Sequence, residues 1–274
     1  MKTRMLLAAA AFTLSPALPA VADEPTWPDL RHALFGDQFL IPAGDVIKIN
    51  APYRAADDVR AQISASIEVP AGKMIESISV VLDENPMPVS AVFDFEAPVP
   101  RFVFDMTMRI NGPTALHVIA KTTEGQLFMS EAFVKTSGTG ACAAPPGTDP
   151  EVALATLGDM ELDVSDMSGP KISLASLSGA TAPADKMLNI AIDHPMHSGL
   201  QMDQISLLFI PARFIDAIDV DINGQEFVDI TGSISFSENP DIKISIPAQT
   251  GRVDVELTDT DGSETHARKV LAGI

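Results

Sequence analysis

Cysteine is nearly absent from this sequence, because Cys142 is the only one among 274 residues. A single thiol excludes a disulfide within the chain, so this side chain is either inert or free to react. It lies in the stretch SGTGACAAPPG, residues 137–147, which consists mainly of glycine, alanine and proline. The role of a lone thiol in such a stretch is the first question that this sequence raises.

The sequence motifs of common enzymes are missing. There is no G-x-S-x-G motif, no P-loop, no dinucleotide-binding fingerprint and no H-E-x-x-H motif. Carboxylates are abundant but scattered, so no acid–base pair can be chosen. The single tryptophan, Trp27, and the single tyrosine, Tyr53, are too isolated to define a platform for carbohydrate. We therefore expect a protein without its own catalytic constellation and without a cofactor.

Positive charge is scarce. The chain has 18 Lys and Arg residues against 37 Asp and Glu residues, which gives a net charge of −19 at pH 7. This charge argues against partners that are nucleic acids or anionic membranes. It favours a soluble protein that docks on basic surfaces of other proteins, although solubility alone explains the charge equally well.

Residues 1–22 have the pattern of a secretory signal peptide. Lys2 and Arg4 form a basic start, and an apolar run extends from Met5 to Leu18. Ala20-Val21-Ala22 fits a signal-peptidase site, which predicts cleavage before Asp23. The run is shorter than the roughly 18 apolar residues of a membrane span, and no later stretch reaches that length. We expect an exported protein of the bacterial periplasm.

The remaining pattern is that of an all-β protein. Apolar residues alternate with other residues along 102–110, and 75–82 and 221–230 are also typical of strands. Asn223-Gly224 is typical of a tight hairpin turn. The sequence has 21 prolines and frequent turn residues, which favour antiparallel β-sandwiches. One short helix is expected over 26–35, because proline and aspartate follow its first residues.

Two internal similarities indicate a duplicated architecture. Residues 75–80 parallel residues 215–220, and residues 117–125 parallel residues 254–262. We predict two similar sandwiches packed on one another, the first within 23–136, with its strands from about 38, and the second within 165–274. Residues 137–164 would be the linker, with a short helix near 150–157. Cys142 then lies on the connection between the two domains.

The composition around Cys142 predicts a mobile, solvent-accessible arm. Gly138 and Gly140 permit backbone conformations that other residues avoid. Pro145 and Pro146 lack amide donors and resist incorporation into a sheet. No Lys or Arg lies between residues 135 and 171, so no neighbour in sequence lowers the pKa of the thiol. A mobile arm that carries a nucleophile is what a covalent carrier needs, whereas the alternative is a buried, inert thiol.

A second unusual stretch is His194-Pro195-Met196-His197. Imidazole and thioether groups suit copper, which makes a metallochaperone one alternative. In an extended segment, however, His194 and His197 would point to opposite faces, which weakens a shared metal site. We expect a structural or docking role for His194, Met196 and His197. The isolated His32, His117 and His266 are interpreted as surface or packed side chains.

These stretches resemble two protein families. Residues 45–142 resemble SoxY, a sulfur carrier of bacterial thiosulfate oxidation, through VIKINAP, IESISVVLDENPMP, ALHVIAKTTEGQLFMSEAFVK and the glycine-flanked cysteine. Residues 188–271 resemble its partner SoxZ through DHPMHSGL, IPARFIDAIDVDINGQ, FSENPDIKISIPA and GRVDVELTDTDG. The resemblance implies two immunoglobulin-like sandwiches in one chain. It also implies that Cys142 is the covalent attachment point for a sulfur intermediate, with Gly138 and Gly140 as the hinge of its arm.

The fused form is similar to SoxYZ-like carriers associated with quinoprotein dehydrogenases. The resemblance implies partners among periplasmic redox enzymes, either a Sox-type cytochrome or a quinoprotein dehydrogenase, and a monomer with an internal domain interface. The arm departs from the SoxY pattern, because alanines and two prolines replace the glycines after the cysteine and the second domain closes the arm into a loop. The alternatives are an accessory module of a quinoprotein dehydrogenase and the copper metallochaperone.

Overall fold

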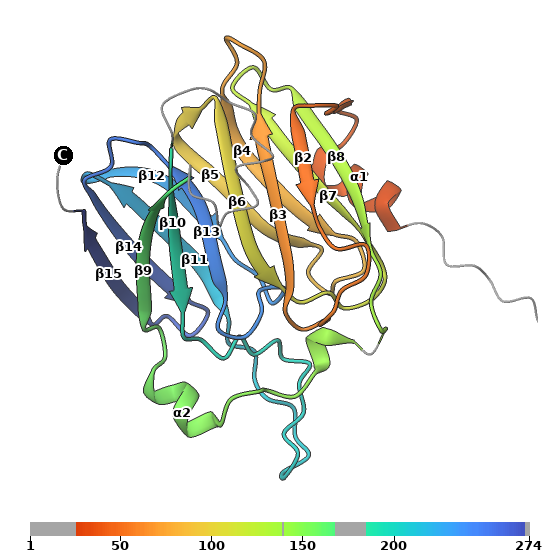
Figure 1. Cartoon of the computed structure of the whole chain (residues 1–274). Coiled ribbons are helices and arrows are strands. Elements are labelled where there is room, and N and C mark those ends of the chain that lie inside the picture. Colours follow the sequence, from red (N-terminus) through yellow and green to blue (C-terminus); the bar gives the residue numbers. More distant parts are fainter. Residues whose placement is uncertain (1–25, 139, 168–184, 272–274) are drawn as a thin grey trace, which may run out of the picture.

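The structure is a computed structural model that describes residues 26–138, 140–167 and 185–271 (Figure 1). These residues form two layers of β-sheet with two short α-helices, α1 (Thr26–Phe35) and α2 (Pro150–Ala155). The expected all-β fold with a short N-terminal helix is confirmed. The predicted signal peptide, residues 1–22, lies outside the described residues. Within those residues, no helix is long and apolar enough to cross a membrane.

The larger sheet has nine strands in the order β1-β8-β7-β4-β5-β12-β11-β14-β15. Its neighbouring strands are antiparallel apart from β1 and β8, which are parallel. The strand bounds are β1 (Leu40–Pro42), β4 (Ile75–Leu82), β5 (Val89–Val99), β7 (Thr114–Thr122), β8 (Leu127–Val134), β11 (Ile215–Ile222), β12 (Gln225–Thr231), β14 (Arg252–Asp259) and β15 (Glu264–Val270).

The smaller sheet has six antiparallel strands in the order β2-β3-β6-β13-β10-β9. Their bounds are β2 (Ile47–Asn50), β3 (Ala61–Glu68), β6 (Arg101–Met108), β9 (Met160–Asp166), β10 (Lys186–Ile192) and β13 (Asp241–Ile246). The linker that follows β8 contains a 3₁₀ turn, η1 (Ala141–Ala143), and then α2.

The two halves of the chain join edge to edge. Strand β5 pairs with β12 in the larger sheet, and β6 pairs with β13 in the smaller one. Strands β4 and β11, which begin at Ile75 and Ile215, occupy corresponding places on either side of this junction. Instead of two closed sandwiches packed on one another, each sheet therefore runs through both halves. The domain boundaries at 136 and 165 stay a prediction.

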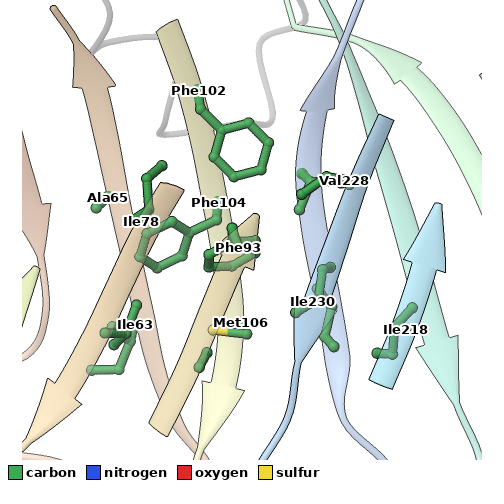
Figure 2. Close-up of a cluster of buried hydrophobic side chains, with 14 of the residues drawn as sticks. Ile63, Ala65, Ile78, Phe93, Phe102, Phe104, Met106, Ile218, Val228 and Ile230 are labelled. Carbon is green, nitrogen blue, oxygen red and sulfur yellow. The ribbon is translucent and has the colours of Figure 1, made fainter. Parts of the chain in front are cut away.

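The core lies between the two sheets and is continuous across the junction. Phe93 and Phe104 stack with ring centroids 5.1 Å apart, and Phe95 meets Phe227 of the other half at 6.1 Å. Figure 2 shows part of this core, in which Val228 and Ile230 of the second half lie beside strand β5 of the first, where Ile230 pairs with Phe93. The alternation along 102–108 arises because successive side chains of a strand point to opposite faces. Burial of this shared apolar surface holds the two halves together.

Candidate functional site

Cys142 is buried in the structure, contrary to the expectation of an exposed and mobile arm. Its residue is 0% exposed and lies in η1, at the end of the molecule where the linker leaves β8. The sequence prediction was wrong because it considered only the small side chains around the thiol. Those small side chains allow the backbone to lie close to the loops of both halves, and polar groups of these loops bind it.

The segment 140–148, here called the cysteine segment, is held by hydrogen bonds from both halves. The backbone N–H of Cys142 donates to Asn111 Oδ1 at 3.2 Å, and Asn111 is itself fixed by Asn85. From the second half, Ser198 Oγ donates to the carbonyl oxygen of Cys142. Gln201 Nε2 donates to the carbonyl oxygen of Ala144 at 3.0 Å. The backbone on both sides of the thiol is thus bound to loops that are distant in sequence.

The downstream end of the cysteine segment is bound by one carboxylate. Glu238 accepts the backbone N–H of Gly147 at 2.7 Å and that of Thr148 at 2.8 Å. Pro145 and Pro146 provide no donor between these contacts. Upstream, Gly138 and Gly140 have φ of 78° and 79°, in the left-handed region that favours glycine. These φ values agree with the expectation that the two glycines adopt conformations that other residues avoid. Their role as a hinge stays a prediction.

The electrostatics of the site keep the thiol protonated. Burial raises the pKa of Cys142 to about 11, and the positive charge of Arg109 partly opposes this effect. Arg109 is therefore the cation that reasoning from sequence neighbours missed. It follows β6 in the chain, so the fold alone brings it near the thiol.

Arg109 is a buried cation without a close carboxylate. Its residue is 3% exposed, and none of the ion pairs among the described residues includes it. Its Nη1 donates to the carbonyl oxygens of Met196 and Ile234. Burial lowers the pKa of Arg109, and the negative charges of a Cys142 thiolate and of Glu238 oppose that shift. A buried cation in this setting is best stabilised by an anion nearby.

The motif 194–197 lies within the site. His194 and Met196 are 1% and 0% exposed, which agrees with the structural role expected for them, while a docking role for the motif stays a prediction. His194 Nδ1 accepts the backbone N–H of Met196 at 3.0 Å, and the Met196 carbonyl in turn accepts from Arg109. His197 is only half-buried, and its backbone pairs with that of Arg213.

Both ring nitrogens of His194 are engaged within the protein. Because Nδ1 accepts a hydrogen bond, the proton lies on Nε2, which faces Asp259 Oδ2 at 3.5 Å. Burial lowers the pKa of His194 to about 4. Burial also lowers the pKa of His197, and the charge of Arg109 lowers it further while that of Glu238 opposes the shift. Among the described residues, no three His, Cys, Asp or Glu residues are grouped so as to hold a metal ion.

A cavity of about 270 Å³ opens beside the downstream half of the cysteine segment. Arg109, Gln201 and Glu238 line it together with Ala144 and Pro145. The residues that hold the segment thus also border a space next to it.

The residues that hold the cysteine segment were not identified as functional from the sequence. Ser198 and Glu238 lie within motifs that carried the family resemblance, HPMHSGL and FSENP, but no contact could be assigned to them. Asn111 precedes Gly112-Pro113 and looks like an ordinary turn residue. Only the three-dimensional arrangement shows that these side chains meet the same backbone.

Comparisons with known proteins divide the chain in two. Residues 31–142 match the family model SoxY, described as sulfur oxidation protein SoxY. Residues 179–270 match the model SoxZ, described as sulphur oxidation protein SoxZ. No curated protein matches the chain.

Solved structures give partial similarity. The sulfur carrier protein SoxY from Chlorobium limicola f thiosulfatophilum is 25% identical over 40% of this chain and 90% of its own, with a TM-score of 0.32. A superoxide reductase (neelaredoxin) from Ignicoccus hospitalis is 19% identical over 34% of this chain and 80% of its own, with a TM-score of 0.26. At such TM-scores, the structural likeness carries no argument about function.

Proposed function

From the premise that the chain is a fused SoxY–SoxZ-like protein, we propose that it is a covalent carrier that holds a sulfur-containing intermediate on Cys142 and presents it to partner enzymes. The SoxY match ends at Cys142 itself. Sox carriers work with partner enzymes and are not enzymes themselves. The proposal extends this general role to one residue of this chain.

The observation that carries the proposal is the way the cysteine segment is held. Its backbone N–H groups donate to Asn111 and Glu238, and its carbonyl oxygens accept from Ser198 and Gln201. An inert core cysteine needs no such contacts, because apolar packing is enough to bury it. Each hydrogen bond is worth about 0.5–1.5 kcal/mol net, so the segment can leave without unfolding of the sheets. A closed, bound form and an open, released form follow from this arrangement.

The two forms differ in reactivity. In the closed form, the thiol is buried and its pKa is about 11, compared with its ordinary 9.0. Release into water removes the desolvation, which increases the thiolate fraction at neutral pH about 100-fold, since each pKa unit is a factor of ten. A carrier benefits from this difference, because its thiol is protected between partners and becomes reactive when the segment is released.

Loading with tetrathionate tests the proposal. The released Cys142 thiolate attacks a central sulfur of tetrathionate, the central S–S bond breaks, and thiosulfate leaves with the electron pair. The product is Cys142–S–S–SO₃⁻. We expect intact mass spectrometry of the folded protein to show one such adduct, and Cys142→Ser to show none. Protein purified from its native cells should also carry sulfur adducts at Cys142.

Two results would count against the carrier. One is a thiol that reacts only when the whole protein unfolds, and the other is a Cys142→Ser variant that supports normal sulfur-dependent turnover in cells. The full burial of Cys142 favours a second candidate, an accessory module of a quinoprotein dehydrogenase in which the thiol is incidental. Under that hypothesis, the dehydrogenase co-purifies with the chain while the native thiol carries no adduct.

The setting of the carrier is also part of the proposal. We propose export to the periplasm by residues 1–22, activity as a monomer, and partners that are a Sox-type cytochrome or a quinoprotein dehydrogenase. The strand pairs β5–β12 and β6–β13 support the monomer, since they join the two halves internally. Gel filtration with light scattering tests this point, and a mass of two chains would reject it.

A further inference from the structure

Exposed apolar side chains are concentrated on one loop of the second half. Of the 14 large hydrophobic residues that are exposed among the described residues, six lie within ten positions. They are Leu200, Met202, Ile205, Leu207, Leu208 and Phe209. Ile205 is 94% exposed and Phe209 is 65% exposed. Monomeric proteins seldom leave such a group in water unless it contacts another molecule.

The loop is an ordered hairpin, here called the apolar hairpin, residues 197–213. His197 and Arg213 pair at its base, with N···O distances of 2.7 and 2.9 Å. Met202 pairs with Phe209 farther out, and the backbone N–H of Asp203 donates to Leu208 at 2.9 Å. In Figure 1 it projects beyond the sheets as the teal loop at the lower end of the molecule. Its apolar side chains are thus held away from the core.

The base of the apolar hairpin, here called its stem, binds the cysteine segment. Ser198 and Gln201 provide the two hydrogen bonds to the carbonyls of Cys142 and Ala144. The same two residues support the hairpin itself, since Ser198 N–H donates to Gln201 Oε1 and Ile210 N–H donates to the carbonyl of Gln201. A displacement of the tip therefore changes the contacts that hold the thiol. The hairpin therefore borders the site from which Cys142 is released.

The negative charge of the protein indicates which kind of molecule binds the exposed tip of the hairpin, residues 202–209. The chain carries −19, which opposes a second copy of itself and an anionic bilayer. Exposed acids, Asp149 and Glu151, lie at the start of α2, which is at the same end of the molecule as the hairpin (Figure 1). Asp203 lies on the hairpin itself. An apolar cleft with Lys and Arg at its rim complements this surface.

We propose that the apolar hairpin is the docking element for the enzyme that loads or unloads Cys142, and that docking of its tip in an apolar cleft with a basic rim releases the cysteine segment. This inference depends on the proposed carrier function. Docking supplies the free energy of burying Ile205, Leu208 and Phe209. This free energy is used to break the hydrogen bonds of Ser198 and Gln201 to the cysteine segment. The thiol therefore becomes reactive only where a partner is present.

The first experiment identifies the partner. Phe209 of the full chain is replaced by the photo-crosslinking residue p-benzoylphenylalanine, and Phe39, which is 75% exposed on the first half, is replaced in the same way as the matched control. After irradiation of native cells, the protein linked at position 209 but not at position 39 is identified by mass spectrometry and purified. We expect this protein to load or unload Cys142.

The second experiment uses that purified protein. Ile205→Ser/Phe209→Ser should lower kcat/KM for the carrier about 30-fold or more, because each side chain contributes several-fold when it leaves water and because docking at the tip also releases the cysteine segment. The control Phe39→Ser/Val270→Ser removes side chains that are 75% and 67% exposed and should leave kcat/KM unchanged. Adding the partner should also accelerate alkylation of wild-type Cys142 by iodoacetamide, and should not do so for the hairpin variant.

Each other outcome rejects the docking proposal. These outcomes are an unchanged kcat/KM, a partner that leaves the alkylation rate unchanged, a crosslink only to a second copy with a doubled mass, and hairpin-dependent binding to phosphatidylcholine vesicles. Absence of any crosslink at position 209, while Cys142 carries adducts in the same cells, also rejects it. If Cys142 carries no adduct in cells, the carrier function itself fails, so the two failures are distinguishable.

Discussion

The hydrogen bonds from Ser198 and Gln201 should control how often Cys142 is exposed. Ser198→Ala removes the donor to the Cys142 carbonyl, and Gln201→Ala removes the donor to the Ala144 carbonyl. Both changes leave the strands and the shared core untouched. They test whether the closed form is an equilibrium state that can open on its own.

The magnitude follows from the net value of a hydrogen bond. At about 1 kcal/mol each, one lost bond increases the open fraction about fivefold, and two lost bonds increase it about 30-fold. When opening is fast compared with alkylation, the observed rate is proportional to that fraction. Since Ser198 N–H also donates to Gln201, the double variant need not equal the sum of the single variants.

The assay is iodoacetamide alkylation of the folded protein, followed by intact mass at a fixed pH. Ser77→Ala, on the larger sheet and away from the site, is the matched control and should react like the wild type. Urea unfolding should show that the variants keep most of their free energy of unfolding. Equal alkylation rates for all variants would refute the reasoning. A wild-type rate equal to the rate of global unfolding would do the same.

Four further predictions concern the same site. Loading Cys142 with –S–SO₃⁻ instead of the neutral –S–CH₃, from methyl methanethiosulfonate, should stabilise the wild type by about 2 kcal/mol through the charge of Arg109. Thermal unfolding should show the difference, and Arg109→Met should abolish it. Gly140→Ala places a side chain at φ 79°, so the closed form should weaken by about 1 kcal/mol and alkylation should be several-fold faster. Because the pKa of His194 is lowered to about 4, the unfolded state takes up a proton below pH 6.5 before the folded state does. As the pH falls from 7.5 to 4.5, His194 should therefore account for about 2.5 kcal/mol of the stability lost, and urea unfolding of His194→Gln should show a total loss smaller by about that amount. Calorimetric titration with copper should reveal no tight site that His197→Ala removes, since both ring nitrogens of His194 are engaged in the protein.

The fold could be predicted because its signals are local. The alternation along 102–108 and the turn at Asn223-Gly224 follow from the period of a strand and from turn chemistry. The repeat between 75–80 and 215–220 gave the correspondence of β4 and β11. The edge-to-edge junction could not be predicted, because strand pairing between halves depends on register over long sequence separations.

Of the candidate site, only Cys142 itself could be predicted from the sequence. Cys142 was selected because it is the single thiol, but its burial depends on Asn111, Ser198 and Glu238, which come from separate loops. Arg109 looked like an outward-facing strand residue, because the alternation was extended past the end of β6 at Met108. Where a strand ends, its period no longer determines the direction of a side chain.

The closed ends of the cysteine segment limit how far its cargo can travel. Cys142 lies eight residues after the end of β8 at Val134 and eight residues before α2 begins at Pro150. Eight extended residues span at most about 29 Å, so the backbone of Cys142 can reach no farther than this from its anchors even when fully released. Both halves of the loop must enter together, and two extended chains side by side need a channel about 10 Å wide. The reactive group of any enzyme that uses this carrier must therefore lie in a wide entrance no deeper than that reach.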